Sequence, residues 1–113
     1  MVLTKVSIDE LQPTDLDLVS ETIFFYRTTF PLLRDNFPPE VWMLRGKMYI
    51  ADGNNQVYDF YERGRKNILV KLFTPENCSM SSDAYEYALS QVLEKAGEAE
   101  DRGIRHISDL KIA

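Results

Sequence analysis

The stretch "EVWMLRGKMYIAD", residues 40–52, limits what this chain can fold into more than any other part of the sequence. Two runs of strand-forming residues flank the Arg-Gly-Lys triplet at 45–47, which is the pattern of a β-hairpin. The second run leads through Asp52 and Gly53 into a helical pattern that Gly64 can end. The sequence therefore predicts a hairpin over residues 40–52 whose second strand runs into the start of a helix.

The rest of the sequence predicts alternating helices and strands, with proline and glycine near their ends. Apolar residues of the expected helices recur every three or four positions, which places them on one face. The predicted elements are a strand over 4–8, a helix from Thr14 to before Pro31, a helix from about Asn55 to Arg63, a strand over 67–73 and a long C-terminal helix over 81–102. The tail after Gly103 is compatible with a short strand or a helical turn. This order predicts an α/β (α+β) fold with a small mixed sheet, a hairpin and packed helices.

Length and charge narrow the class of protein further. With 113 residues, the chain is long enough for one compact domain and too short for two, so residues 1–113 are predicted to form a single domain. The net charge of −5 disfavours binding of the isolated domain to nucleic acid, because phosphate backbones are also negative. The single cysteine cannot form an internal disulfide, and no signal peptide or membrane span is visible. We therefore expect a cytoplasmic protein with no membrane association.

Several short motifs follow one another in a defined order along the first two thirds of the chain. They are Leu11-Gln12-Pro13, Gly46, Asp52-Gly53, Gly64 and Ile68-Leu69-Val70. In this order and with these spacers, they resemble the ParB/sulfiredoxin-like superfamily, often labelled ParB-like nuclease domains, over about residues 5–73. The resemblance implies a fold in which a hairpin delivers an Asp-Gly-x-His-Arg type motif to a helix N-terminus. It also implies that this motif contacts nucleotide phosphates, with phosphotransfer or nuclease activity in catalytic relatives.

The candidate nucleotide-binding site is the junction formed by Asp52, Gly53, Asn54, Asn55 and Gln56. A glycine allows a tight turn, and the N-H groups that begin the next helix carry a partial charge of about +0.5, which favours a phosphate. Asn54 and Asn55 are suitable cap residues, and their amides can donate to a phosphate or ribose oxygen. The motif is degenerate, because Asn55 and Gln56 stand where relatives carry histidine and arginine. Without the arginine, phosphate binding should be about tenfold weaker, or more.

Charge for a phosphate ligand would have to come from outside this junction. The candidate supporting cations are Arg34, Arg45 and Lys47. A nucleotide with Mg²⁺ is the ligand that the resemblance implies. The sequence alone leaves the cofactor and any catalytic residues undetermined.

The sequence predicts no metal site of its own. Asp59 is predicted to lie on the far side of its helix, so the fold would have to bring Asp9, Glu10 or Asp15 beside Asp52 to make a two-carboxylate site. His106 is the only histidine, and a lone histidine near a chain end is more often a surface or packing residue than a catalyst. Cys78 lies more than twenty residues beyond the motif in which sulfiredoxins carry their cysteine, so we expect Cys78 to be dispensable.

The sequence leaves two hypotheses about function. In the first, the domain binds a nucleotide or another phosphate-bearing ligand weakly at residues 52–56, with reduced or no catalysis. In the second, it is a catalytically silent interaction or regulatory module of the same fold. Such a module would use exposed aromatic residues or the C-terminal helix to contact a protein partner or a second copy of the chain. Titration with nucleotides and Mg²⁺ distinguishes the two hypotheses.

Overall fold

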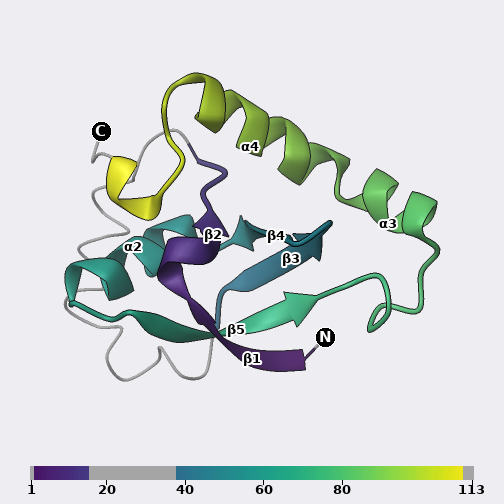
Figure 1. Cartoon of the computed structure of the whole chain (residues 1–113), viewed down its shortest axis with the longest axis horizontal. Coiled ribbons are helices and arrows are strands. Elements are labelled where there is room, and N and C mark those ends of the chain that lie inside the picture. The colour runs from purple at the N-terminus through teal and green to yellow at the C-terminus, as the bar shows by residue number, and fades with distance from the viewer. Residues whose placement is uncertain (1, 16–37, 111–113) are drawn as a thin grey trace.

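The computed structural model describes residues 2–15 and 38–110, and Figure 1 shows how their elements are arranged. The strands are β1 (Val2–Ser7), β2 (Leu11–Gln12), β3 (Glu40–Leu44), β4 (Lys47–Asp52) and β5 (Asn67–Phe73). The helices are α2 (Asn54–Glu62), α3 (Ser82–Ala88) and α4 (Ser90–Asp101), with short 3-10 turns η1 (Ile8–Glu10) and η3 (Ile107–Asp109). Beyond Asp15, the helix predicted to run toward Pro31 lies outside the described residues, as does the candidate cation Arg34.

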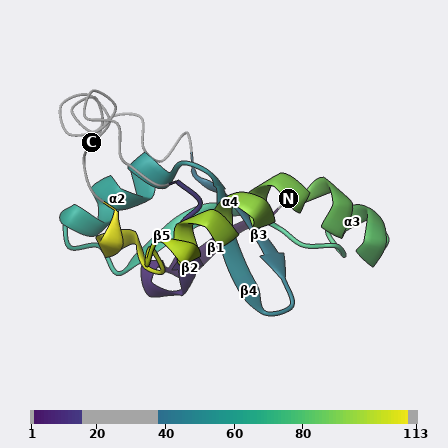
Figure 2. The same cartoon turned by 90° about the horizontal axis from the view of Figure 1, so that it is seen from above.

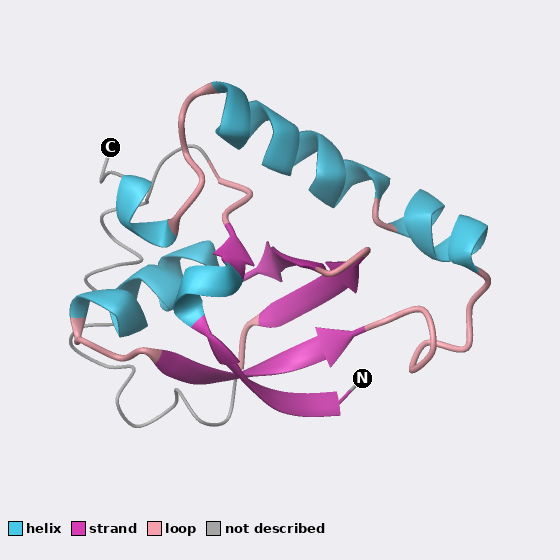
Figure 3. Ribbon diagram, viewed as in Figure 1, coloured by secondary structure: helices cyan, strands magenta, loops and turns pink. Residues whose placement is uncertain are grey.

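The five strands form one mixed sheet in the order β1-β5-β3-β4-β2. β1 pairs antiparallel with β5, and β3 pairs antiparallel with β4. The pairs β3–β5 and β2–β4 are parallel. Figure 3 shows this sheet in magenta, with the helices in cyan above it and to one side. The predicted α/β class, with a small mixed sheet and packed helices, is confirmed.

The β3–β4 hairpin closes through a two-residue turn at Arg45 and Gly46. These residues have φ of 51° and 80°, and Leu44 pairs with Lys47 across the turn. Positive φ at both central positions is typical of a type I′ turn, whose twist matches that of the flanking strands. The hairpin predicted over residues 40–52 is therefore confirmed, together with its turn.

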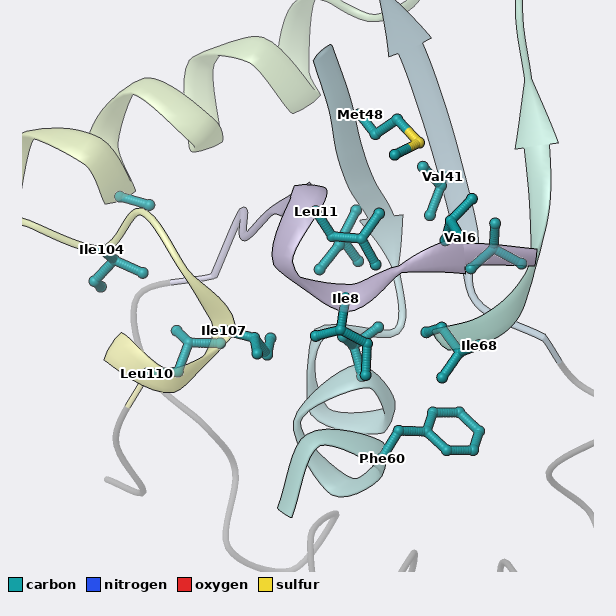
Figure 4. Packing of buried hydrophobic residues seen from close by; sticks show 14 residues of the cluster. Val6, Ile8, Leu11, Val41, Met48, Phe60, Ile68, Ile104, Ile107 and Leu110 are labelled. Atoms are coloured by element: carbon teal, nitrogen blue, oxygen red, sulfur yellow. The ribbon is translucent and has the colours of Figure 1, made fainter. Parts of the chain in front are cut away.

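One face of the sheet is covered by the main hydrophobic core. Along β5, Ile68 and Val70 are buried whereas Leu69 between them is 50% exposed, which is the alternation expected of a strand with one covered face. Figure 4 shows buried side chains from the N-terminal segment, α2 and the C-terminal tail packed together. These side chains include Val6, Ile8, Leu11, Phe60, Ile104, Ile107 and Leu110. The tail after Gly103 therefore forms a 3-10 turn that closes the core.

The C-terminal helical segment differs from the single helix predicted over 81–102. The structure contains two helices, α3 and α4, that meet at the buried residue Leu89 (Figure 2). The Tyr85 hydroxyl lies 2.6 Å from the Met43 carbonyl oxygen and 2.9 Å from the Phe73 carbonyl oxygen, which fixes α3 at the ends of β3 and β5. α4 instead contacts β4. Because the two helices pack on different parts of the sheet, the break lets both bury their apolar faces.

α2 begins at Asn54, one residue before the predicted start, and ends at Glu62. Its predicted apolar face is only partly buried. Val57 and Phe60 lie in the core, but Tyr61 is 38% exposed and its ring makes a T-shaped contact with the His106 ring. None of the helices in the described ranges is long and apolar enough to cross a membrane.

Candidate functional site

The junction between β4 and α2 is a sharp turn at Gly53. β4 ends at Asp52, and Gly53 is the N-cap residue of α2 with φ 105° and ψ 27°. Any other residue would be strained at this φ, and a Cβ at position 53 would lie 3.1 Å from the Pro39 Cβ. The junction therefore favours glycine, because any other residue would be strained at this φ and its Cβ would crowd Pro39.

Asn54 ties the junction to the segment that follows β2. Its Oδ1 accepts a hydrogen bond from the Thr14 backbone N-H at 3.0 Å, and its Nδ2 donates to the Thr14 hydroxyl at 2.9 Å. The same hydroxyl donates to the Ile50 carbonyl oxygen at 2.6 Å. Asn54 is buried and is the first residue of α2, so the expectation that it caps the helix is wrong. Its amide connects two segments of the fold.

Asn55 and Gln56, the degenerate positions of the motif, have different environments. Asn55 is half-buried and lines a pocket at the junction. Gln56 is only 4% exposed and does not line this pocket. Its Oε1 lies so close to the turn that a Cβ at position 53 would be 3.3 Å from it. An arginine in place of Gln56 would therefore bring a charge into a buried position, which is unfavourable without a partner.

The pocket at this junction, which we call the junction pocket, has a volume of about 320 Å³. Its lining residues come from three separate segments of the chain and are mostly polar or charged. They are Thr14 and Asp15 after β2, Ala51 and Asp52 at the end of β4, Gly53, Asn54 and Asn55 around the start of α2, and Lys95 on α4. Small-molecule sites have volumes of about 300–1,000 Å³, so the junction pocket has room for a small polar group.

Three charged side chains determine the electrostatics of the junction pocket: Asp15, Asp52 and Lys95. Burial raises the pKa of Asp15 above its usual range, while the Lys95 ammonium opposes this rise and the Asp52 carboxylate adds to it. The fold has thus brought a second carboxylate, Asp15, close to Asp52. Across residues 2–15 and 38–110, no three or more histidine, cysteine or carboxylate side chains gather in a metal-binding arrangement.

Neither Arg45 nor Lys47 reaches the junction pocket. Arg45 lies in the hairpin turn, where its guanidinium group pairs with the Glu86 carboxylate at 3.0 Å. Lys47 begins β4, at the opposite end of the strand from Asp52, and a strand of this length spans about 17 Å. Within residues 2–15 and 38–110, the cation that lines the pocket is Lys95. Lys95 could not be predicted from the sequence, because it lies on a distant helix and no local pattern links that helix to the junction.

Cys78 and His106 take no part in the junction pocket. Cys78 is half-buried, with its Sγ 3.4 Å from the Asn77 Oδ1. His106 contacts Asp9 and Ser108 with its two ring nitrogens. His106 was predicted to be a surface or packing residue, and the sequence could not show its contact with Asp9, because the two residues are 97 positions apart.

The fold and the site together define a small α/β domain with a polar pocket at a strand-to-helix junction. The chain is similar in structure to the protein Atu1540 from Agrobacterium tumefaciens, with a TM-score of 0.62 and 14% sequence identity. The superposition covers 99% of this chain and 62% of that protein, so the chain spans less than two thirds of the length of Atu1540. At this identity, the likeness shows a shared fold alone. No family model matches the chain, and no match to a curated protein was found.

Proposed function

We propose that this domain binds a nucleotide or another phosphate-bearing ligand weakly in the junction pocket, with reduced or no catalysis. The observation that carries this proposal is the placement of Lys95 beside the N-terminus of α2 in one polar pocket. The N-terminal end of a helix carries a partial positive charge, and an ammonium group adds a full one. The motifs that resemble the ParB/sulfiredoxin-like superfamily support the same assignment.

The carboxylates of the junction pocket determine which form of the ligand fits. Asp15 and Asp52 together place two negative charges around one positive charge on Lys95. A free phosphate would be repelled by this excess of negative charge. Mg²⁺ would supply the missing positive charge, and oxygen ligands such as those of Asp15 and Asp52 are the type that Mg²⁺ prefers. We therefore expect a nucleotide to bind as its Mg²⁺ complex, with a Kd of about 10–1,000 μM.

Replacing Lys95 with alanine should weaken binding of the Mg²⁺-nucleotide about tenfold. A hydrogen bond or ion pair to a charged group contributes about 1.5–3 kcal/mol, and the lower end applies to an exposed lysine. Isothermal titration calorimetry of the wild type and Lys95→Ala with ATP, CTP and GTP, each with Mg²⁺, measures this change. Lys66→Ala is the matched control, since Lys66 is also an exposed lysine but lies outside the junction pocket. Equal weakening by both variants would contradict the proposal.

Asp15→Asn should stabilise the free protein at neutral pH. Because burial raises the folded-state pKa of Asp15, ionised Asp15 opposes folding, and this cost grows as the pH rises through the range above about 4. The variant should therefore melt at a higher temperature than the wild type at pH 7, and the difference should shrink as the pH falls toward 4. Thermal unfolding followed by circular dichroism at several pH values measures both effects.

The same variant tests how the ligand binds. If Mg²⁺ joins the carboxylates to the phosphates, Asp15→Asn should weaken nucleotide binding in Mg²⁺ and strengthen it in EDTA, where only charge repulsion is relieved. Tighter binding under both conditions would show that Asp15 does not hold the cation. If neither nucleotide binding nor any effect of Mg²⁺ is detected in the wild type, the proposal is wrong.

A catalytically silent interaction module is the second candidate function. It is favoured by exposed apolar residues at the β1–β5 edge of the sheet, where Val2, Leu3 and Leu69 are 52%, 56% and 50% exposed. Analytical ultracentrifugation of the wild type and Leu3→Ser would detect self-association through this edge. A sedimentation coefficient that depends on concentration in the wild type alone would support this candidate.

A further inference from the structure

Asp9, His106 and Ser108 form a chain of hydrogen bonds that does not belong to the junction pocket. The His106 Nε2 lies 2.7 Å from the Asp9 Oδ1, and the His106 Nδ1 lies 2.7 Å from the Ser108 Oγ. Asp9 comes from η1 near the start of the chain, whereas Ser108 belongs to η3 near its end. Folding therefore connects a carboxylate, an imidazole and a hydroxyl in one line of contacts.

The directions of these hydrogen bonds follow from the chemistry of the groups. An ionised carboxylate can only accept, so the Nε2 of His106 carries the proton that is donated to Asp9. In a neutral imidazole, Nδ1 then has the free electron pair. This nitrogen accepts from the Ser108 backbone N-H at 3.1 Å, and the Ser108 hydroxyl can donate to it as well. The neutral imidazole is thus held in the form that can take a proton from Ser108.

The residues on either side of Ser108 hold its turn in place: Asp109 through hydrogen bonds and Ile107 through burial in the core. The Asp109 Oδ2 accepts hydrogen bonds from the backbone N-H groups of Arg105 and His106, each at 3.0 Å. These two donors lower the pKa of Asp109, so its carboxylate remains ionised at neutral pH. The next residue after His106, Ile107, is buried in the core. Ser108 itself is exposed, so a reagent in solution can reach it.

We propose that Ser108 is an activated nucleophile that attacks activated carboxylic esters, with His106 as its general base and Asp9 as the residue that positions His106. A nucleophile within hydrogen-bond reach of a base, which is itself oriented by a third group, is the arrangement that activates serine in hydrolytic enzymes. This inference is independent of the junction pocket. The second site lies where Asp9 of η1 contacts His106, the N-cap residue of η3.

The proposed reaction is an acyl transfer. The Ser108 Oγ forms a bond to the carbonyl carbon of the ester, its proton moves to the His106 Nδ1, and Asp9 stabilises the resulting imidazolium. The bond from the carbonyl carbon to the leaving oxygen breaks, and that oxygen receives the proton from Nδ1. Water then attacks the acyl-serine by the same proton transfers, which releases the carboxylic acid and restores the Ser108 hydroxyl.

The probe for this reaction is p-nitrophenyl acetate, whose leaving group is followed by its absorbance. We expect a burst of p-nitrophenol from the wild type, together with an increase in mass of one acetyl group located on Ser108 by peptide mass spectrometry. General-base catalysis contributes about 100-fold or more, so His106→Gln should slow acetylation about 100-fold, whereas Ser108→Ala lacks the nucleophile and should abolish the burst and the acetyl group at this position. Ser108→Cys should keep the burst, because a thiol is also a nucleophile. Ser90→Ala is the matched control, since Ser90 is an exposed serine at the start of α4.

Asp9→Asn tests the positioning role. Asp9 is 83% exposed, so water screens its charge and the expected loss of rate is about tenfold rather than complete. Asp9→Glu should recover part of that loss, because it restores a carboxylate that can accept from the His106 Nε2. Acetyl groups found on lysines rather than Ser108, or a burst that is unchanged in Ser108→Ala, would overturn the proposal.

Discussion

Asn54→Ala should lower the free energy of unfolding by about 2–4 kcal/mol. The substitution removes both hydrogen bonds to Thr14 and leaves the buried Thr14 N-H without its acceptor, and an unsatisfied buried donor costs about 1–3 kcal/mol in addition to the lost bond. For a domain of this size, the melting temperature should fall by about 8–16 °C. Urea unfolding followed by circular dichroism provides the direct measurement.

The matched control for this prediction is Asn67→Ala, since Asn67 is an exposed asparagine on β5. Its effect should be within about 0.5 kcal/mol of zero. A double-mutant cycle with Thr14→Val should show strong coupling to Asn54→Ala, because each residue supplies the partner of the other. If Asn54→Ala changes stability no more than Asn67→Ala, Asn54 does not hold the junction to the N-terminal segment. The asparagine would then be available to a ligand.

Tyr85→Ala should destabilise the domain by about 3–5 kcal/mol, the range for replacing a large buried aromatic residue with alanine. The Tyr85 ring is fully buried and lies 5.3 Å from the Trp42 ring, between centroids. Its hydroxyl also reaches the carbonyl oxygens of Met43 and Phe73. We expect α3 to detach from the sheet, which should be visible as faster hydrogen exchange of the α3 amides in the variant.

Tyr87→Ala is the control, because Tyr87 lies two residues later in the same helix and is 83% exposed. It should leave stability almost unchanged. Tyr85→Phe separates the hydroxyl from the ring and should cost about 1–3 kcal/mol. Similar losses from Tyr85→Ala and Tyr87→Ala would show that α3 does not depend on this anchor.

The hydroxyl of Tyr85 also predicts a dependence on pH. Burial raises its pKa from 10 to about 12 in the folded protein, so its contribution to stability is complete below pH 10 and is lost as the pH rises toward 12. Between pH 10 and pH 12, Tyr85→Phe should therefore lose less stability than the wild type.

Local sequence was sufficient to predict the hairpin and the glycine turn that leads from β4 into α2. The two-residue turn at Arg45 and Gly46 requires positive φ, and buried positions alternate along β4 at Met48 and Ile50. Glycine was also predicted correctly at the strand-to-helix turn, where Gly53 has a φ that other residues rarely adopt. These features depend on residues that are neighbours in the chain, so their pattern is visible without a tertiary structure.

Only the tertiary structure decided what the side chains around the junction do. Asp15 and Lys95 reach the pocket from two distant segments, while Gln56, which belongs to the motif, is buried outside it. Asn54 has the residue type of a helix cap, but its amide holds Thr14 instead. The same reason explains the break at Leu89, since each half of the predicted helix packs on a different part of the sheet. The spacing of apolar residues in the sequence predicts which residues become buried. The partner that each side chain contacts depends instead on how segments far apart in the chain pack together.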